Sequence, residues 1–360
     1  MNYNTIKFKN FKHIDKVFRK QANEIDRLNC YRFDRNERIS SLPKKLLNII
    51  KKNFKSEYIT AYPNLKNIYS LIGKETKLKK ENILITAGSD IAIKTCFELL
   101  INRNDQIITI YPTYGMVDVY ARLFGATQKK VFFKNKLNLE TDKIITNINP
   151  KTKLIILANP NSPTGTVISE ENLVKILKKA SKLNTFVLID ECYYGFYKKT
   201  FINKIHKFNN LIVSRSLSKA YGLAGCRIGY LASNKDIIKK LYKFKPMHEI
   251  SSFSAYVAEI FLKNKKIVLD YIKSVQEGLI YFKKFLDKKN ISYYKSYANF
   301  ILVDFKNRKK FIKILKEAKK SKILIHGESD LIGCENCVIF TLGPKTYMKI
   351  IEKLILKCLR

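Results

Sequence analysis

One lysine, Lys219, lies among hydroxyl and guanidinium groups in the segment S-R-S-L-S-K-A-Y-G-L-A-G-C-R, directly after a short apolar run. A lysine amine has a reference pKa of about 10.4, so it is a nucleophile near neutral pH only when burial or positive charge lowers that pKa. Arg215 and Arg227 could supply this charge. Ser216 and Ser218, with Arg227, could bind a dianion beside the amine. The segment therefore fits a cofactor that carries an aldehyde and a phosphate, and the alternative is a solvated loop.

Asp190 comes at the end of the apolar run 186–189, where an unpaired carboxylate is costly. A protonated pyridine nitrogen is a cation that could pair with Asp190 and keep an aromatic ring electron-withdrawing. Tyr193 follows shortly and could reach a phenolic oxygen on that ring. The other interpretation of Asp190 is a helix N-cap. Because Lys219 follows the next strand along the chain, both groups are predicted at one edge of a sheet.

Further strand ends carry short polar or aromatic side chains. Gly88, Ser89 and Asp90 open a predicted helix, where backbone N–H groups and the helix dipole could face a phosphate. Tyr114 lies on a Pro/Gly turn and could stack on a flat ring, or simply pack. Two prolines and a glycine fix the backbone of N-P-N-S-P-T-G, which presents Asn161 and Ser162. Each feature alone is an ordinary turn or helix start, but their recurrence at strand ends favours a ligand site.

The elements that must position these residues follow an alternating pattern. Apolar runs alternate with helical spacing, as over 91–100 and 172–182, which predicts an α/β fold with a mostly parallel sheet sandwiched between helices. The predicted strands are Ile83–Thr86, Gln106–Tyr111, Thr127–Phe133, Leu154–Ala158, Thr185–Asp190, Leu211–Ser214 and Ile228–Leu231.

After about Pro246 the pattern changes to helices, over 256–262 and 267–286, with short strands between later polar stretches. This change predicts a smaller α+β domain. The expected organisation is an N-terminal arm over 1–45 that contains one helix and joins the small domain, a large domain over 46–245, and a small C-terminal domain over 246–360.

Basic residues are in large excess, with 69 Lys and Arg against 30 Asp and Glu and a formal net charge of +39. Such a charge raises nucleic acid or an anionic membrane surface as a partner, and it attracts small anionic substrates. The lysines recur on nearly every predicted helix, and no tail concentrates them. A solvated basic surface is therefore favoured over nucleic-acid binding.

Seven scattered cysteines, an odd number, argue against a disulfide framework and indicate a reducing compartment, so a cytoplasmic protein is expected. Cys334 and Cys337 form a C-x-x-C, but a zinc site needs a second pair or nearby histidines, and no metal is expected. The first 20 residues lack the apolar core of a signal peptide. No stretch of about 18 apolar residues predicts a membrane helix.

The motifs, in this order and spacing, resemble those of the fold-type I pyridoxal-phosphate aminotransferases, and within them the histidinol-phosphate aminotransferase-like branch. The resemblance runs from Asn36 to Gly343. It implies that Lys219 bonds the cofactor aldehyde and shuttles a proton, that Asp190 pairs with the pyridine nitrogen, and that Tyr193 hydrogen-bonds the phenolic oxygen.

The same resemblance implies the remaining cofactor contacts. Tyr114, in P-T-Y-G-M, would stack on the ring. Tyr62, in A-Y-P-N, matches a tyrosine that reaches the phosphate from the neighbouring subunit, which implies a homodimer with shared active sites. The residues that would hold the phosphate are Gly88, Ser89, Asp90, Ser216, Ser218 and Arg227.

Three positions depart from the family pattern. Ser162 stands where asparagine is usual, so a bond to the ring oxygen could come from Asn161 or Ser162. Two arginines that usually bind the substrate's anionic groups correspond to His326 and Ile339, which removes the bidentate clamps for carboxylate or phosphate. We therefore expect a different anchor for the acceptor in the N-terminal arm, and the candidate substrate contacts are Arg32, Arg35, Asn36, Arg38 and His326.

The predicted reaction is transamination, with glutamate as the donor by resemblance and a small phosphorylated ketone or aldehyde as the acceptor. Decarboxylation of a phosphorylated amino acid on the same scaffold needs the same lysine and aspartate, and it stays open. The alternative of another class is a basic nucleic-acid-binding protein that has kept a cofactor fold. It predicts steeply salt-dependent DNA binding.

Overall fold

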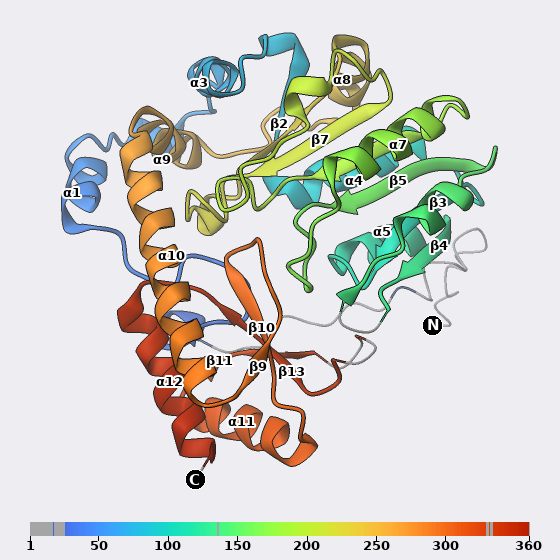
Figure 1. Cartoon of the computed structure of the whole chain (residues 1–360). Helices are drawn as coiled ribbons and strands as arrows, with labels where there is room; N and C mark the ends of the chain where they lie inside the picture. The colour runs from blue at the N-terminus through green and yellow to red at the C-terminus, as the bar shows by residue number, and fades with distance from the viewer. Residues whose placement is uncertain (1–16, 18–25, 135–136, 329–330, 332–333, 360) are drawn as a thin grey trace, which may run out of the picture.

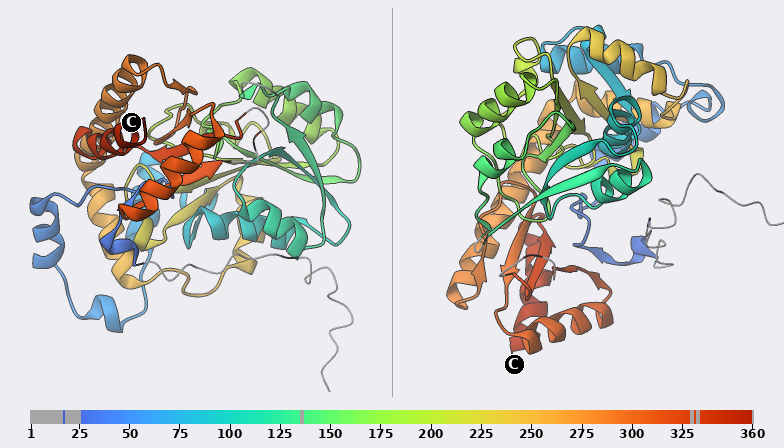
Figure 2. Two further views of the ribbon diagram at one scale, coloured as in Figure 1. Left: turned by 90° about the horizontal axis from the view of Figure 1, so that it is seen from below. Right: turned by 90° about the vertical axis from the view of Figure 1, so that its right-hand side faces the viewer.

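The structure is a computed structural model of the 360-residue chain, and it describes residue 17 and residues 26–134, 137–328, 331 and 334–359. The described chain forms a large sheet and a smaller C-terminal sheet, each with its own helices (Figure 1). The right-hand view of Figure 2 places the two sheets at opposite ends of the molecule. Of the N-terminal arm over 1–45, in which one helix is predicted without bounds, the structure describes residue 17 and residues 26–45.

The large sheet has seven strands in the order β2-β8-β7-β6-β5-β3-β4. β8 runs antiparallel to β2 and β7, and the other neighbouring pairs are parallel. The predicted mostly parallel sheet is therefore confirmed. The strands are β2 Ile83–Thr86, β3 Gln106–Tyr111, β4 Thr127–Phe132, β5 Thr152–Ala158, β6 Phe186–Asp190, β7 Leu211–Ser216 and β8 Gly229–Ala232.

Both faces of this sheet are covered by helices, as the apolar strands require. Successive side chains of a strand point to opposite faces. Leu188 and Ile212 accordingly lie in a core with α4 and α5, whereas Val187 and Val213 lie in a second core with α7 and α9. The helices are α1 Lys44–Lys52, α2 Glu57–Thr60, α3 Lys66–Thr76, α4 Gly88–Leu100, α5 Met116–Leu123, α6 Thr141–Thr146, α7 Glu170–Ser181, α8 Lys235–Leu241 and α9 Ser252–Lys263.

Helix α7 shows how the sequence specifies such an element. The Ser169 side chain accepts a hydrogen bond from the Asn172 N–H and caps the N-terminus. Two glutamates in the first turn and two lysines in the last turn complement the helix dipole. Leu173 and Leu177 lie one turn apart on the buried face. The helix therefore occupies nearly the predicted range 172–182.

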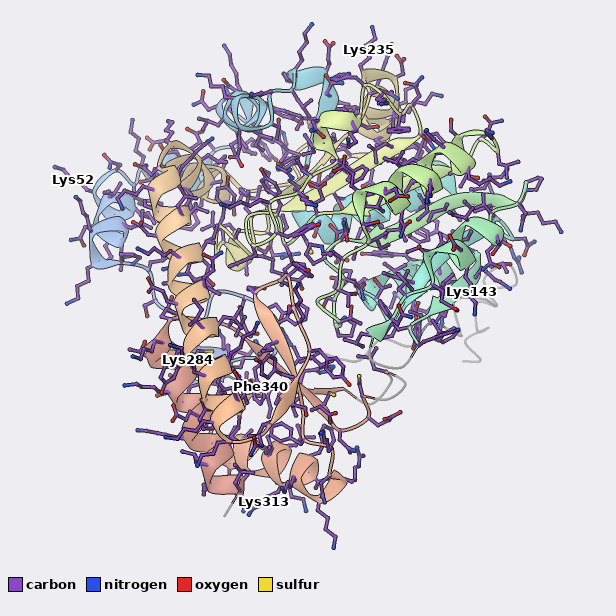
Figure 3. The ribbon with its side chains drawn as sticks, viewed as in Figure 1. Lys52, Lys143, Lys235, Lys284, Lys313 and Phe340 are labelled. Carbon is purple, nitrogen blue, oxygen red and sulfur yellow. The ribbon has the colours of Figure 1, made fainter. Side chains whose placement is uncertain are left out.

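The smaller sheet is antiparallel, in the order β12-β13-β10-β9. Helix α12 packs on α10 and α11. Their apolar side chains form a separate core around Phe282 and Phe340, and Phe340 is completely buried (Figure 3). The elements are α10 Lys265–Lys288, β9 Ser292–Tyr293, β10 Phe300–Asp304, α11 Arg308–Lys320, β12 His326–Glu328, β13 Cys337–Thr341 and α12 Lys345–Leu359.

The N-terminal arm is attached to the small-sheet side. β1 Tyr31–Arg32 pairs in parallel with β11 Ile323–Leu324, and the Thr341 N–H donates to the Phe33 carbonyl oxygen at 2.9 Å. Helix α9 follows residue 246 but packs on α3 and α2, so the structure places it with the large sheet. The exact domain boundaries stay a prediction.

Candidate active site

Most of the predicted functional residues line one cavity of about 630 Å³ beyond the carboxyl ends of β5, β6 and β7. Open α/β sheets bind ligands at this edge. The cavity is closed on one side by the N-terminal arm. The predicted residues in its lining are Ser89, Asp90, Tyr114, Ser162, Asp190, Tyr193, Ser216, Ser218, Lys219, Arg227, Arg35 and Asn36.

Lys219 lies just beyond the end of β7, and its amine is part of the cavity lining. Nζ donates a hydrogen bond of 2.8 Å to the carbonyl oxygen of Arg35 and lies 5.8 Å from the centre of the Tyr193 ring. Burial lowers the pKa of Lys219, and the charge of Arg227 lowers it further. Because the neutral amine is the nucleophile and base, the site shifts this pKa in the direction that the predicted chemistry needs.

Contrary to the prediction from the sequence, Arg215 does not lie beside Lys219 in the cavity. Its guanidinium forms an almost completely buried ion pair with Glu191, with Nη2 3.0 Å from Oε2, and lies 3.4 Å from the centre of the Tyr194 ring. Alternation along β7 directs this side chain away from the cavity. The expectation that Arg215 helps to lower the pKa of Lys219 is therefore wrong, and Arg227 supplies that charge.

Asp190 ends β6 and is 4% exposed. Ser214 Oγ donates a hydrogen bond of 2.7 Å to Oδ1, and the Cys192 side chain also hydrogen-bonds the carboxylate. Burial nevertheless raises the pKa of Asp190 to about 6. A cation brought in by a ligand would stabilise the ionised carboxylate, and a protonated ring nitrogen is such a cation.

Tyr193 is buried at the cavity wall, and its hydroxyl oxygen accepts a hydrogen bond of 3.0 Å from Asn36 Nδ2. Ser162 hydrogen-bonds the same oxygen. The side chain of Asn161 is used within its own loop, where Oδ1 accepts from Thr113 at 2.8 Å and Nδ2 donates to a backbone carbonyl. Of the two predicted ligands of the ring oxygen, the geometry favours Ser162.

The predicted phosphate site is built from loops that approach closely. A Cβ on residue 229 would lie 2.6 Å from backbone atoms of Gly88 and Ser89, so glycine at this position lets β8 approach the start of α4. Gly88 has a φ of +84°, which favours glycine, and a Cβ there would lie 2.8 Å from Arg227 Nη2. The small residues therefore let Arg227 and the N-terminus of α4 converge.

Ser218 tests whether this region fits a phosphate. Its Oγ is buried and has no hydrogen-bond partner among the described residues, while its N–H donates to Ser216 Oγ at 3.0 Å. An unpaired buried hydroxyl costs about 1–3 kcal/mol, and a phosphate oxygen would remove that cost. Asp90 Oδ1 accepts a hydrogen bond from Tyr120. Because like charges repel, Asp90 would contribute to a phosphate site through its backbone N–H.

The three arginines proposed as substrate anchors have different surroundings. Arg35 lines the cavity, its side chain is 61% exposed, and its Nε lies 3.8 Å from the Asp34 carboxylate. Arg32 forms an ion pair within the arm. The Arg38 guanidinium lies 4.3 Å from the centre of the Tyr271 ring. Arg35 is therefore the arginine of this set that is available to a ligand in the cavity.

Tyr62 and His326 lie outside the lining formed by the described residues. Tyr62 is 81% exposed, and its ring stacks on His248 with 4.2 Å between centres. His326 is exposed on β12, directly opposite Ile339 in β13. His326 and Ile339, the two positions expected from the sequence to correspond to substrate-binding arginines, are therefore neighbours across one strand pair.

Several residues of the cavity lining were not predicted from the sequence. Asp34 and Glu37 line the arm side, and Arg27 bridges their carboxylates at 2.7 and 2.8 Å. The polar cluster at 33–38 is a visible signal in the sequence, but its partners cannot be deduced from spacing. Cys192 lines the opposite side beside Asp190.

The site fits pyridoxal phosphate, because an amine, a buried carboxylate and a dianion site surround one cavity. The fold and the site define the class as a fold-type I pyridoxal-phosphate enzyme. The sequence profile of the family "Aminotransferase class I and II" matches residues 30–348. The chain therefore belongs to this family, and it is a pyridoxal-phosphate-dependent aminotransferase of the histidinol-phosphate aminotransferase-like type.

Individual relatives agree with this assignment. The chain is 33% identical over 319 residues to the histidinol-phosphate aminotransferase of Caldanaerobacter subterraneus subsp. tengcongensis, which covers 87% of this chain and 88% of the relative. It is 35% identical over 283 residues to that of Thermoanaerobacter sp. strain X514, covering 77% and 79%. The fold matches the pyridoxal-5'-phosphate complex of the Sinorhizobium meliloti histidinol-phosphate aminotransferase with a TM-score of 0.86, 18% identity and 98% coverage of both chains.

Proposed function

We propose that this aminotransferase moves an amino group from glutamate to a small phosphorylated ketone or aldehyde. The relatives named histidinol-phosphate aminotransferase support a phosphorylated substrate. One observation carries the proposal: Arg35 lines the same cavity as Lys219 and Asp190. A phosphorylated acceptor could therefore place its carbonyl near the amine and its anionic group near the guanidinium.

The residues of the chain would divide the work at this site. Pyridoxal phosphate supplies, when bound, an aldehyde that takes up amines and a ring that withdraws electrons. Lys219 Nζ would take the Cα proton of the donor and move it along one face of the ring. Asp190 would hold a proton on the ring nitrogen. Tyr193 and Ser162 would orient the ring through its phenolic oxygen.

Arg35 is the proposed anchor for the anionic group of the acceptor. The usual arginine positions hold His326 and Ile339, so a charge-assisted bond must come from elsewhere. The Arg38 guanidinium contacts the Tyr271 ring, and Arg38 Nε donates to the Ser40 carbonyl at 3.2 Å. Among the described residues, Arg35 forms one long ion pair, of 3.8 Å, with Asp34. This difference supports Arg35 over Arg38.

We further propose a homodimer with shared active sites. Tyr62 projects from the surface beside His248, and Met247 and Ile59 are 85% and 74% exposed. A second copy would cover these side chains and receive Tyr62 at its phosphate site. Mixing inactive Lys219→Ala subunits with Tyr62→Ala subunits should restore activity in heterodimers. Failure of complementation between stably mixed subunits would contradict sharing.

We place the enzyme in the cytoplasm, as the cysteines suggest. All seven cysteines are free thiols. Among the described residues, no helix combines the length and apolarity needed to cross a membrane.

The substrate proposal is tested by half-reactions. The pure protein is incubated with single amino acids, and loss of the yellow aldehyde absorbance identifies the donor. Phosphorylated ketones and aldehydes are then screened for return of that absorbance, with their dephosphorylated forms as matched controls. Glutamate and a phosphorylated acceptor are the expected pair. Equal rates with the dephosphorylated forms would contradict the phosphate requirement.

Two alternatives have distinct signatures. Release of carbon dioxide from a phosphorylated amino acid, without any keto acceptor, would select the decarboxylase. Steeply salt-dependent DNA binding would select the nucleic-acid-binding protein. Against the latter, the lysines labelled in Figure 3 come from well-separated elements of the chain. They are Lys52, Lys143, Lys235, Lys284 and Lys313.

A further inference from the structure

Two consecutive residues of the N-terminal arm, Arg35 and Asn36, contact the Lys219 amine and the Tyr193 hydroxyl, two groups that would act on the cofactor. The carbonyl oxygen of Arg35 accepts from Lys219 Nζ at 2.8 Å. The side chain of Asn36 donates from Nδ2 to the Tyr193 hydroxyl at 3.0 Å. The arm therefore contacts both Lys219 and Tyr193, although it is far from both in sequence.

Asn36 itself is fixed from the small-sheet side. Thr341 Oγ1 accepts from the Asn36 N–H at 3.0 Å and donates to Asn36 Oδ1 at 3.2 Å. Asn299 Nδ2 donates to the Asn36 carbonyl at 3.0 Å. The φ of Asn36 is +54°, a conformation that asparagine and glycine adopt more readily than other residues. Residue type, backbone and partners are thus all specified.

The bond from Thr341 determines which way the Asn36 amide points. Since Oδ1 is the acceptor for Thr341, Nδ2 must face Tyr193 as a donor. A phenol has a single hydrogen, and its oxygen already receives the amide hydrogen. The Tyr193 hydrogen must therefore point to another acceptor, on the side where Ser162 and the cavity lie.

We propose that Asn36 is a positioning residue that fixes the direction of the Tyr193 hydroxyl, so that Tyr193 donates into the cavity toward the cofactor's phenolic oxygen. This inference rests on the proposed placement of Tyr193 beside that oxygen. It assigns Asn36 a role through Tyr193 in addition to the substrate contact expected from the sequence. The backbone conformation and the hydrogen bonds to Thr341 and Asn299 explain why asparagine serves this purpose.

The direction of the Tyr193 hydroxyl should affect the pH dependence of the absorbance of the bound cofactor. The titratable groups that face Tyr193 are Lys219, Cys192 and Asp190, and the Phe300 ring packs against it with 5.6 Å between centres. A donor to the phenolic oxygen of the cofactor favours the form with more negative charge on that oxygen. Loss of the donor therefore raises the pH at which the absorbance of the bound cofactor changes.

Asn36→Asp is the test variant, because it keeps the size and the acceptor oxygen but replaces the donor with a second acceptor. The Tyr193 hydroxyl is then expected to turn toward residue 36. The pH midpoint of the cofactor absorbance should rise by about one pH unit, a tenfold change in proton affinity, as for the loss of one hydrogen bond. Thr341→Ser keeps the hydroxyl that orients Asn36, and it should leave the midpoint unchanged.

A double-mutant cycle separates this effect from the added charge. In a Tyr193→Phe background, Asn36→Asp should shift the midpoint much less, because the phenol through which it acts is gone. An equal shift in both backgrounds would overturn the proposal, and so would an unchanged midpoint in Asn36→Asp when Tyr193→Phe alone shifts it. If Tyr193→Phe alone has no effect, the placement of Tyr193 at the cofactor fails as well.

Asn36→Gly covers the case in which Asn36→Asp does not fold. Glycine tolerates the positive φ and adds no charge. The cofactor-free variant should unfold cooperatively on heating. With the cofactor bound, the absorbance midpoint of the variant should move in the same direction as in Asn36→Asp, by a smaller amount. A folded Asn36→Gly protein with the wild-type midpoint would overturn the proposal.

Discussion

The two walls of the cavity differ in how well their polar groups are satisfied. On the strand-end wall, burial raises the pKa of Asp190 to about 6, lowers the pKa of Lys219, and leaves Ser218 Oγ without a partner among the described residues. On the arm wall, Arg27 forms ion pairs with both Asp34 and Glu37, and Arg32 forms a second ion pair with Glu37. The strand-end wall therefore needs an external ion, whereas the carboxylates of the arm wall already form ion pairs with arginine, and Arg35 is the exposed arginine of that wall.

The largest effect should come from removing the amine of the strand-end wall. Lys219→Ala should lower kcat by at least about 10⁴-fold, because both nucleophilic and proton-transfer roles are lost. Stopped-flow and steady-state assays with the identified substrates measure this. Lys235→Ala, an exposed lysine on α8, is the matched control and should be fully active. Appreciable turnover by the Lys219→Ala enzyme would show that the strand-end wall does not supply the catalytic amine.

A second effect concerns the stability of the cofactor-free protein. The pKa of Asp190 is raised from 3.8 to about 6 in the folded state, so its favourable contribution is present below pH 3.8 and is lost as the pH rises through 6. This amounts to about 2 kcal/mol between pH 4 and pH 7. Relative to wild type, cofactor-free Asp190→Asn should become more stable by about this amount across that range.

Urea unfolding at several pH values provides the measurement, and the difference between the two proteins cancels the pH dependence of other groups. Saturation with pyridoxal phosphate should abolish the advantage of Asp190→Asn, because the ring nitrogen then pairs with the wild-type carboxylate. If the difference in unfolding free energy between the two cofactor-free proteins does not change with pH, folding does not raise the pKa of Asp190.

The smallest of these effects tests the arm wall. Arg35→Ala should raise the KM of the phosphorylated acceptor by about tenfold or more with little change in kcat, as expected for the loss of one charge-assisted hydrogen bond. Arg38→Ala should instead lower the melting temperature, because it removes the contact with Tyr271, and leave KM unchanged. Unchanged Michaelis constants in both variants would remove the arm from the anchoring role.

The residues of the strand-end wall could be predicted from the sequence, because the carboxyl ends of parallel strands meet at one edge of the sheet. Once alternation predicts a parallel sheet, Lys219, Asp190 and Ser218 must share one edge. The direction of Arg215 was not predicted, because its partner Glu191 directly follows a different strand, β6, and only the sheet register shows which face the pair occupies.

The contacts of the arm wall could not be predicted from the sequence in this way. The contacts of Asn36 with Tyr193, Thr341 and Asn299 span most of the chain, and no periodicity encodes them. Long-range docking also decided between Arg35 and Arg38, which are equivalent candidates in the sequence. Packing against Tyr271 makes Arg38 structural.

The most direct test of the account is to trap the bound cofactor on the chain. The holoenzyme is reduced with borohydride, digested, and analysed by mass spectrometry for phosphopyridoxyl-lysine. The account predicts one labelled residue, Lys219, and a loss of label in Lys219→Ala. Label on any other lysine of the holoenzyme, with Lys219 unmodified, would contradict it.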